Sequence, residues 1–286
     1  MDIREKLDKD KFIVTCEITP PKGTDILHAV KFAEKLKLKA DAFNVTDNQR
    51  SVMRLSSLAL SVALKQRGLE PIMQVTCRDR NRLAIQSDLL GAKALGVANI
   101  LALTGDHPSS GDHPQAKPVF DLDSVQLIET ISMLNTGHTL SGYKLSAPTN
   151  FFIGAVLNPF SSNPDLEIIK LKKKSEHGAL FFQTQVVYDP AGYIEFIKKI
   201  KHLNLKIIAG VMPVRSIKMA EFISKKIPGI KMPESIIEEI RSSSDPHETG
   251  KKQVLKIIEK IRPYCDGVHI ISSGCEKVIM ELLEAL

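Results

Sequence analysis

The chain has 286 residues, of which 43% are hydrophobic and 25% charged, a composition typical of a folded protein with a sizeable core. The formal net charge is +6, but only 5% of residues are aromatic and tryptophan is absent, which argues against the stacking platform of a single-strand nucleic-acid binder. No apolar run approaches the roughly 18 residues that a membrane span needs. The start of the chain lacks the apolar segment of a signal peptide, so we expect a cytoplasmic protein with no membrane or nucleic-acid partner.

Short apolar runs alternate with longer amphipathic stretches from one end of the chain to the other. Eight of the runs fit buried strands, because each is short, continuous and followed by polar or turn residues. These predicted strands cover residues 12–18, 42–45, 71–76, 99–103, 152–157, 180–184, 206–211 and 267–271. Between them, the stretch 80–95 predicts a helix that ends before Gly96, a natural C-cap residue. The stretch 193–202 predicts another helix, with an apolar face opposite a charged one.

The regular alternation of strands and helices predicts an α/β fold. Eight strand–helix units in about 270 residues match a (β/α)8 TIM barrel in number and length. Because no linker divides the chain, we expect a single domain over residues 1–286. A doubly wound sheet stays open as the alternative, since alternation alone cannot show closure. Residues 106–122 and 136–149 predict long loops, and residues 229–251 predict an additional helical segment before the last strand.

Cysteine and histidine usage does not predict a metal site. The four cysteines form no C-x-x-C pair and have no zinc spacing with a histidine. Since a cytoplasmic compartment is reducing, we expect free thiols rather than bridges. The eight histidines are scattered, and His107, next to Asp106, lacks the neighbours that a metal would need.

Polar side chains follow the predicted strands, at the end where an α/β barrel binds its ligands. Glu17, Asp106 and Gln185 lie on or just beyond apolar strands, where a carboxylate or amide is costly unless it is paired or used. Asp106 alone would fit a turn or a helix cap equally well. However, an apolar strand followed by polar side chains recurs along the chain. The other strand ends contribute Asp47, Gln49, Arg50, Arg78, Asp79, Arg80, Asn158, Arg215 and Ser272. The sequence therefore predicts an active site at this end of the barrel.

The residue types allow acid–base chemistry but do not name a substrate. Glu17 and Asp106 suit a proton donor and an electrostatic partner whose pKa values differ through their environments. A nucleophile elbow, a Ser-His-Asp order, a P-loop and a G-x-G-x-x-G fingerprint are all missing from the sequence. On composition alone, the lysines of the stretch 170–174 fit a solvated helix face.

Six short motifs occur in an order that resembles the methylenetetrahydrofolate reductase family, whose members are flavin-dependent barrels. They are TCEITPPK at 15–22, FNVTDN at 43–48, QVTCRD at 74–79, LALTGD at 101–106, FQTQVVYD at 182–189 and GVMPV at 210–214. Each motif is only moderately specific, but six in order over residues 12–283 are strong together. The resemblance implies the reduction of 5,10-methylenetetrahydrofolate to 5-methyltetrahydrofolate, an oxidoreductase step of one-carbon metabolism and methionine biosynthesis.

The resemblance also implies catalytic and substrate-binding roles. Glu17 matches the acid that helps to protonate the folate as its methylene bridge opens to an iminium. An exposed acid could not hold that proton near neutral pH, so Glu17 should be partly desolvated. Asp106 matches the aspartate that lies between flavin and pterin. Gln185 matches a glutamine at the substrate, and Ile217 falls at a position that packs on bound substrate.

A flavin follows from the same resemblance, with FAD as the first expectation and FMN as the alternative. The protein would orient the flavin against the substrate, and the flavin itself would carry out the redox step. Glu167, Lys170 and Lys174 are three and four residues apart, so they would share one helix face. By the resemblance, this face would contact the ribityl and phosphate portion of the flavin. The positions implied for the cofactor are Thr46, Gln74, Thr104, Gly105, Asp106, Asn158, Glu167, Lys170, Lys173 and Lys174.

The chain departs from better-known members of the family at six positions around these sites. Histidines are replaced by Gln74 and Asn158, arginines by Thr104 and Cys275, an aromatic residue by Gly154 and a phenylalanine by Ile217. These changes alter the surroundings of the flavin and the contacts to nicotinamide and to the folate tail. They leave the three catalytic candidates intact.

The sequence leaves alternatives open for the source of the electrons and for the class of reaction. The chain shows no regulatory extension, so electrons are expected from NAD(P)H directly or through an electron-transfer partner subunit, and a homo-oligomer is a further option. The alternative enzyme is a flavin-free, pterin-binding barrel methyltransferase acting on methyltetrahydrofolate, which would keep Asp106 but need no phosphate-binding helix. A non-catalytic scaffold subunit would have no use for Glu17, Asp106 and Gln185.

Overall fold

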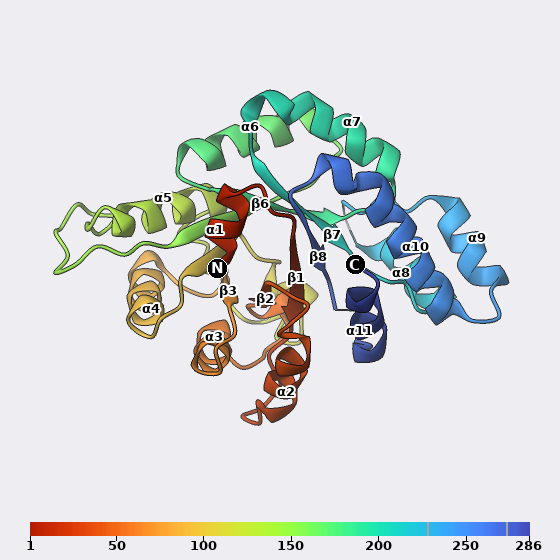
Figure 1. The fold of residues 1–286 in the computed structure, drawn as a ribbon. Helices are drawn as coiled ribbons and strands as arrows, with labels where there is room; N and C mark the ends of the chain where they lie inside the picture. The colour runs from red at the N-terminus through yellow and green to blue at the C-terminus, as the bar shows by residue number, and fades with distance from the viewer. Residues whose placement is uncertain (228, 273) are drawn as a thin grey trace.

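A closed barrel of eight parallel strands forms the centre of the computed structural model, which describes residues 1–227, 229–272 and 274–286 (Figure 1). The strands are β1 (Ile13–Ile18), β2 (Ala42–Val45), β3 (Pro71–Thr76), β4 (Asn99–Leu103), β5 (Phe152–Leu157), β6 (Phe181–Val186), β7 (Lys206–Val211) and β8 (Gly267–Ile270). Each strand pairs with the next along the chain, and β8 pairs with β1 to complete the barrel. The TIM-barrel prediction is confirmed. The doubly wound alternative is wrong, because an open sheet would leave two edge strands unpaired.

Helices surround the barrel and connect its successive strands (Figure 1). The α-helices are α1 (Ile3–Asp8), α2 (Leu27–Leu36), α3 (Ser57–Gln66), α4 (Arg82–Ala94), α5 (Ser124–Asn135), α6 (Pro164–Glu176), α7 (Pro190–Ile200), α8 (Ile217–Lys226), α9 (Glu234–Ser242), α10 (Pro246–Ile261) and α11 (Glu276–Glu284). Short 3-10 helices are η1 (Gln49–Ser51), η2 (Pro108–Ser110), η3 (Lys201–Leu203) and η4 (Arg262–Tyr264). Helix α4 begins slightly later than predicted, because the Asn81 side chain accepts hydrogen bonds from two N–H groups of its first turn. It ends before Gly96, as predicted.

Helix α1, which the sequence pattern does not predict, closes the amino-terminal end of the barrel (Figure 1). Its Ile3 and Leu7 side chains are fully buried and form one cluster with inward-facing barrel residues such as Phe152 and Phe181. A helix of 6 residues is too short to show an amphipathic period, so its role cannot be recognised in isolation. This plug leaves the carboxyl-terminal end as the mouth of the barrel.

Polar side chains fill the barrel interior between this plug and the mouth. The side-chain amides of Asn44 on β2 and Gln183 on β6 exchange hydrogen bonds of 2.6 and 3.1 Å. The hydroxyl of Thr15 lies 2.9 Å from Nδ1 of His269 on β8. Burial lowers the pKa of His269 to about 4, so this imidazole is neutral at physiological pH. These pairs satisfy polar atoms that would otherwise be costly to bury.

Three segments outside the regular alternation agree with their predictions. Residues 106–122 form a long irregular loop that contains η2. Residues 136–149 form a second loop, in which His138 and Lys144 pair in an isolated bridge. Helix α9 lies within 229–251 as an additional helix between α8 and α10.

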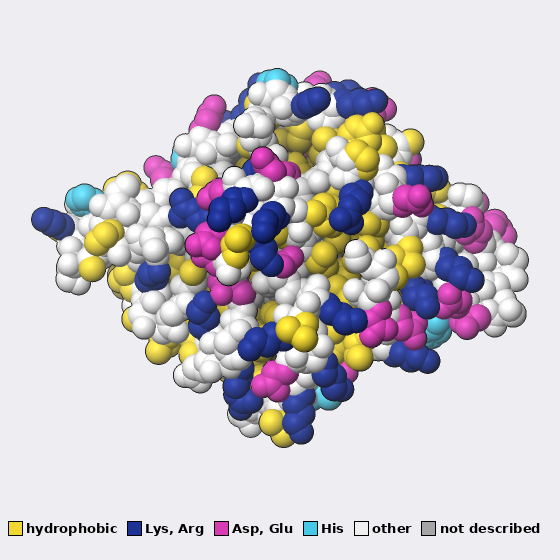
Figure 2. Space-filling view, in the orientation of Figure 1, with side chains coloured by type: hydrophobic (Ala, Val, Ile, Leu, Met, Phe, Trp, Pro, Cys, Tyr) yellow, Lys and Arg dark blue, Asp and Glu magenta, His cyan; other side chains and the backbone are white. Residues whose placement is uncertain are grey.

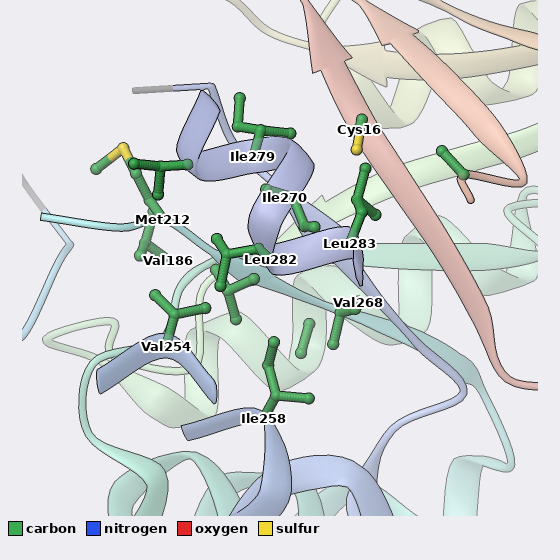
Figure 3. Close-up of a cluster of buried hydrophobic side chains, with 14 of the residues drawn as sticks. Cys16, Val186, Met212, Val254, Ile258, Val268, Ile270, Ile279, Leu282 and Leu283 are labelled. Atoms are coloured by element: carbon green, nitrogen blue, oxygen red, sulfur yellow. The ribbon is translucent and has the colours of Figure 1, made fainter. Parts of the chain in front are cut away.

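Helices α10 and α11 pack against β8 and β1 in a large hydrophobic cluster (Figure 3). Val268 and Ile270 of β8 lie with Ile258 of α10 and Leu282 of α11, and all four side chains are buried. Burial of apolar surface contributes roughly 25 cal/mol per Å² to folding. Cys16 belongs to the same cluster, and all four cysteines are free thiols, as expected.

Charges of both signs are interspersed over the face shown in Figure 2. Exposed pairs such as Lys199 with Glu195 and Arg67 with Glu34 occur on the helices around the barrel. Pairs of this kind contribute little to stability, because solvent screens them. No helix in the described part of the chain combines the length and the apolar character that crossing a bilayer requires.

Candidate active site

A cavity of about 690 Å³ opens at the carboxyl-terminal mouth of the barrel. It is lined by Glu17, Asp106 and Gln185, the three residues predicted to be catalytic, which come from β1, the loop after β4, and β6. The other lining residues are Gln49, Arg50, Ser110, Val186, Met212, Arg215, Met219, Phe222, Ile223, Ile227, Ile230, Ile271 and Ser272. Polar and apolar side chains contribute equally to this wall, which suits a small molecule that has both polar and apolar parts.

A second hollow of about 500 Å³ lies at the opposite end of the barrel. It is lined by α7, η3 and η4 and by residues that precede β7 and β8. In TIM-barrel enzymes, the loops at the carboxyl-terminal face carry the active site, whereas the other face serves stability. We therefore assign the candidate site to the mouth cavity.

Glu17 lies near the end of β1, and only 5% of its surface is exposed. Burial raises the pKa of its carboxyl from a usual 4.5 to about 7. Hydrogen bonds from the Ser272 backbone and from Gln49, together with the positive charge of Arg54, lower this pKa but do not offset the burial. The expected desolvation is confirmed, and it leaves the carboxyl able both to keep and to release a proton near neutral pH.

Gln185 lies within β6, because this strand continues to Val186, two residues beyond the predicted end. Between Gln183 and Val186 the pairing of β6 with β7 shifts by one residue, so Thr184 and Gln185 together oppose a single residue of β7. Such β-bulges re-aim side chains and are frequent next to active sites. Here the bulge accompanies the placement of Gln185 in the cavity wall.

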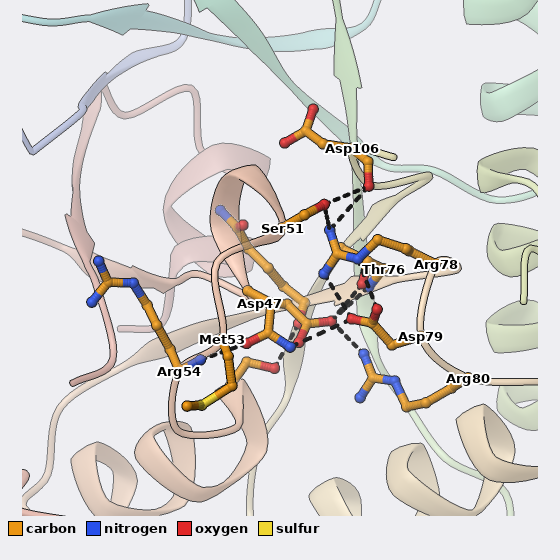
Figure 4. A network of polar contacts seen from close by, with 12 residues as sticks. Asp47, Ser51, Met53, Arg54, Thr76, Arg78, Asp79, Arg80 and Asp106 are labelled. Carbon is orange, nitrogen blue, oxygen red and sulfur yellow. Dashed lines mark hydrogen bonds and ion pairs between the residues drawn. The ribbon is translucent and has the colours of Figure 1, made fainter. Parts of the chain in front are cut away.

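Asp106 is exposed at the cavity and follows β4 through Gly105. Gly105 has a φ of +91°, and a Cβ there would lie 3.1 Å from the Thr76 side chain, so this turn requires glycine. The backbone carbonyl of Asp106 accepts hydrogen bonds from Ser51 at 2.8 Å and Arg78 at 3.3 Å, while its carboxylate points away from them (Figure 4). Among the described residues that carboxylate has no hydrogen-bond partner, which leaves it available to a ligand.

The guanidinium of Arg78 is the buried centre of a polar network beneath Asp106 (Figure 4). It donates to both carboxylate oxygens of Asp79, at 2.7 and 2.8 Å, and to the hydroxyl of Ser51 at 3.2 Å. Arg78 thereby joins the loops that follow β2, β3 and β4. The sequence shows Arg78 as one polar residue among many at the strand ends, and nothing in its spacing reveals these partners.

The loop after β2 has an unusual backbone. Asn48, Arg50 and Ser51 have φ values of 46°, 58° and 56°, in the left-handed region that is unfavourable for residues other than glycine. The Asn48 side chain accepts a hydrogen bond from the Arg54 N–H at 2.9 Å and supports this turn. Between these residues, Gln49 donates from Nε2 to Glu17 at 3.1 Å. Backbone strain of this kind concentrates at functional sites, and here it aims a polar side chain at the buried acid.

Several residues implied for the cofactor lie outside the cavity wall, at the ends of β2 to β5. They are Thr46, Gln74, Thr104, Gly105 and Asn158. Asp106 borders both regions, since it lines the cavity and directly follows Gly105. Thr46 is fully buried, yet its hydroxyl has no hydrogen-bond partner within the described residues. A buried, unsatisfied hydroxyl suits a site that a ligand completes.

Helix α6 carries the acidic and basic residues implied for the flavin phosphate. Glu167 accepts a hydrogen bond from the Asn158 N–H at 2.8 Å. Lys174 donates to a β5 carbonyl at 2.6 Å, and burial lowers its pKa. Glu167, Lys170 and Lys174 all lie within the regular helix α6, where their spacing of three and four residues places them along one face. Lys170 and Lys173 are exposed.

The structure shows what surrounds two of the positions that depart from the family pattern, Ile217 and Gly154. Ile217 is half-buried against the hydrophobic core and does not line the cavity, whereas Met219 and Phe222 of the same helix do. At Gly154, a Cβ would come within 2.2 Å of the Phe181 ring, so that ring occupies the space beside the glycine. The barrel interior therefore accommodates Phe181 at the expense of any larger residue at 154.

Comparisons with known sequences agree with these motifs. The model of the methylenetetrahydrofolate reductase family matches residues 2–286. The chain is 25% identical over 243 residues to methylenetetrahydrofolate reductase 2 of Schizosaccharomyces pombe, covering 80% of this chain and 37% of that protein. It is 25% identical over 259 residues to the 5,10-methylenetetrahydrofolate reductase of Buchnera aphidicola, covering 87% and 82%. The chain thus spans less than two-fifths of the yeast relative and most of the bacterial one.

Solved structures share the barrel. A Clostridium thermocellum protein that binds two copies of 5-methyl-5,6,7,8-tetrahydrofolic acid superposes with a TM-score of 0.64 at 18% identity, over 99% of this chain and 96% of that one. Phosphonopyruvate hydrolase superposes with a TM-score of 0.57 at 11% identity, over 99% and 82%. These similarities concern the fold alone. The family model, by contrast, spans almost every residue, and the chain belongs to the methylenetetrahydrofolate reductase family.

Proposed function

We propose that this chain reduces the methylene bridge of 5,10-methylenetetrahydrofolate to the methyl group of 5-methyltetrahydrofolate, with electrons that pass through a bound flavin. The observation that carries the proposal is the meeting of Glu17, Asp106 and Gln185 in one cavity, where burial raises the pKa of Glu17 to about 7. Membership of the family supports the reaction class. The electrons come from NAD(P)H or from a partner subunit.

Glu17 acts as the general acid. When the methylene bridge opens, one folate nitrogen becomes part of an iminium and the other receives an electron pair that must be protonated. A carboxyl with a pKa near 7 is protonated in about half of the molecules at neutral pH and can return to that state after each turnover. The Ser272 N–H and the Gln49 amide both bond to the carboxyl and fix its position.

Asp106 and Gln185 bind the pterin. The Asp106 carboxylate, which points away from the network beneath it, can accept hydrogen bonds from the N–H groups of the heterocycle. Its negative charge also stabilises the positive charge of the iminium. The Gln185 amide offers one donor group and one acceptor, and Met212 and Ile271 supply apolar contact.

The residues at the ends of β2 to β5 fit a flavin. A reduced flavin, when bound, supplies the hydride that completes the reduction. The unsatisfied Thr46 hydroxyl and the closely packed Gly105 backbone suit the polar edge of such a ring. The exposed ammonium groups of Lys170 and Lys173 suit its phosphate. FAD and FMN share both parts, so the same residues would serve either cofactor.

The first test is whether the purified protein carries a flavin. We expect a yellow protein whose released cofactor is identified as FAD or FMN by mass spectrometry. A colourless preparation that binds neither added flavin would overturn the flavin-dependent reaction and favour the methyltransferase alternative. In that case, methyl transfer from 5-methyltetrahydrofolate to a corrinoid acceptor would be assayed.

The second test separates the two half-reactions with Glu17→Gln. We expect folate reduction to fall by roughly 10²–10⁴-fold, the scale of a lost general acid, because the amide cannot donate the proton. Flavin reduction by a competent donor should stay near the wild-type rate. Equal loss of both half-reactions would contradict the role of Glu17. Glu176→Gln, an exposed position on α6, is the matched control.

A further inference from the structure

The second hollow, at the amino-terminal end of the barrel, has the size of a small-molecule site. Its volume is about 500 Å³, and sites that bind small molecules generally measure about 300–1,000 Å³. Helix α7, the 3-10 helices η3 and η4, and the segments that lead into β7 and β8 supply its walls. Among the residues that the structure describes it shares none with the mouth cavity, so a ligand here would be remote from Glu17, Asp106 and Gln185.

The apolar walls of the second hollow belong to two separate parts of the hydrophobic core. Ile200 and Ile207 are buried members of the cluster that also contains Phe196 of α7. Tyr264 and Cys265 are half-buried and pack against the cluster that contains α10 and β8. The hollow therefore lies where the two clusters adjoin, and it leaves part of their apolar surface uncovered. Covering such surface with an apolar group is favourable, because it removes that surface from water.

Hydrogen bonds hold the walls of the second hollow in place. The hydroxyl of Tyr193, whose side chain is fully buried, donates to the backbone carbonyl of Tyr264 at 3.1 Å. The carboxylate of Asp266 accepts a hydrogen bond from the Ile207 N–H at 2.8 Å and pairs with Lys206 at 3.3 Å. These contacts tie the segment before β8 to α7 and β7. A wall that is already ordered costs little further entropy when a ligand binds.

Lysine side chains give the second hollow a positive charge. Lys198 and Lys201 line it, and the ammonium of Lys198 lies 5.9 Å from the centre of the Tyr264 ring, at the apolar wall. Asp266 is the acidic residue of the described wall, and its charge is already paired with Lys206. The wall thus carries a net positive charge, which attracts an anion. Lysines are exposed elsewhere on the protein too, but these two stand beside an uncovered apolar wall.

We propose that the second hollow binds a small amphipathic anion: a planar apolar body covers the wall of α7 and β7, and a carboxylate or sulfonate pairs with Lys198 and Lys201. Neither part suffices alone. Exposed lysines hold simple anions weakly, because solvent screens the pair, and an uncharged apolar solute gains nothing from the lysines. The site does not depend on the reaction proposed for the mouth, because its residues lie at the other end of the barrel.

Two dyes that differ in a single charged group test this site. 8-Anilino-1-naphthalenesulfonate carries an aromatic body and one sulfonate, and N-phenyl-1-naphthylamine is the same molecule without the sulfonate. In equilibrium dialysis, the holoprotein as purified should bind the sulfonate about tenfold more tightly than the uncharged dye, the scale of one charge-assisted hydrogen bond. The double variant Lys198→Gln, Lys201→Gln should remove most of this difference and leave binding of the uncharged dye nearly unchanged.

Leu205→Trp tests the apolar part of the site. Leu205 is half-buried in the wall, and a larger side chain there would fill the hollow. This variant should weaken binding of both dyes by about tenfold or more, because their apolar body loses its contact surface. The control is the double variant Lys31→Gln, Lys35→Gln on α2, which removes the same charge from exposed positions and should bind both dyes as the wild type does.

Three results would overturn the site. The first is a wild-type protein that binds neither dye, or binds both equally. The second is unchanged binding in both the Lys198→Gln, Lys201→Gln variant and Leu205→Trp, which would place the dyes elsewhere. The third is displacement of the sulfonate by 5-methyltetrahydrofolate, which would assign it to the mouth cavity. The lysine variants change only exposed side chains, so they test the anion contact even if Leu205→Trp fails to fold.

Discussion

Gln49 donates a hydrogen bond from Nε2 to Oε2 of Glu17 over 3.1 Å, which links the strained loop after β2 to the buried acid on β1. A hydrogen bond donated to a carboxylate stabilises its charged form. Gln49 therefore opposes the burial that raises the pKa of Glu17, and keeps that pKa near neutrality. The alkaline limit of the reaction should depend on this contact.

Replacement of Gln49 by methionine tests this relationship at nearly constant side-chain volume. Without the donated hydrogen bond, the pKa of Glu17 should rise by about one to two units, since a hydrogen bond to a charged group is worth roughly 1.5–3 kcal/mol and one pKa unit corresponds to about 1.4 kcal/mol. The folate half-reaction requires the protonated acid, so its decline at high pH should move upward by the same amount. The pH profile of that half-reaction is the measurement. An unchanged profile would show that the contact does not tune Glu17.

The burial of Glu17 should also make stability depend on pH. Its pKa in the folded state, about 7, lies above the usual 4.5, so folding favours the protonated form. The loss of folding free energy that ionisation of Glu17 causes is absent below about pH 4.5, grows as pH rises to about 7, and reaches its full size above that. Glu17→Gln should therefore stabilise the protein at pH 8 by up to about 3 kcal/mol, and much less at pH 5.5. Denaturant unfolding at both pH values checks this, with Glu176→Gln as the exposed control; an equal gain at both pH values would exclude titration of Glu17 as the cause.

Asp106→Asn should weaken folate binding without destabilising the fold. In the described part of the chain the Asp106 carboxylate bonds to no other group, so its loss should change the free energy of unfolding by less than about 0.5 kcal/mol. Affinity for tetrahydrofolate should fall by about 10- to 100-fold, because a charged acceptor for the pterin is removed. Titration calorimetry measures the affinity. Asp112→Asn, in the same loop but outside the cavity wall, should bind folate normally; unchanged binding in Asp106→Asn would contradict its role.

Arg78→Lys should destabilise the mouth of the barrel. Lysine cannot make the paired hydrogen bonds to Asp79 and cannot also reach Ser51, so a buried charge loses partners, at a cost of about 2–4 kcal/mol. Folate affinity should fall as well, because the Asp106 backbone loses the donor that holds it. The matched control is Arg82→Lys, whose partner Asp121 lies on the exposed surface and whose effect should stay below about 1 kcal/mol. Equal effects of the two replacements in denaturant unfolding would refute a special role for Arg78.

The strand pattern was sufficient to predict the barrel, because buried parallel strands appear as continuous apolar runs and the eight runs end within a few residues of the observed strands. Helix α1 was not predicted, because its two apolar residues, Ile3 and Leu7, form no recognisable pattern in the sequence. Their role is seen only where they pack against the end of the barrel. The last two residues of β6 were not predicted for a related reason: they lie at a β-bulge, and a bulge depends on how the strand pairs with its neighbour β7.

Within the site, the sequence by itself determined which side chains stand at the strand ends, and so brought Glu17, Asp106 and Gln185 to one cavity. Only the tertiary structure decided what each group can do. The pKa of Glu17 depends on burial and on Gln49, which belongs to another strand's loop, and the position of Asp106 depends on Arg78. Desolvation and hydrogen bonding arise between segments distant in the chain, so local sequence patterns cannot encode them.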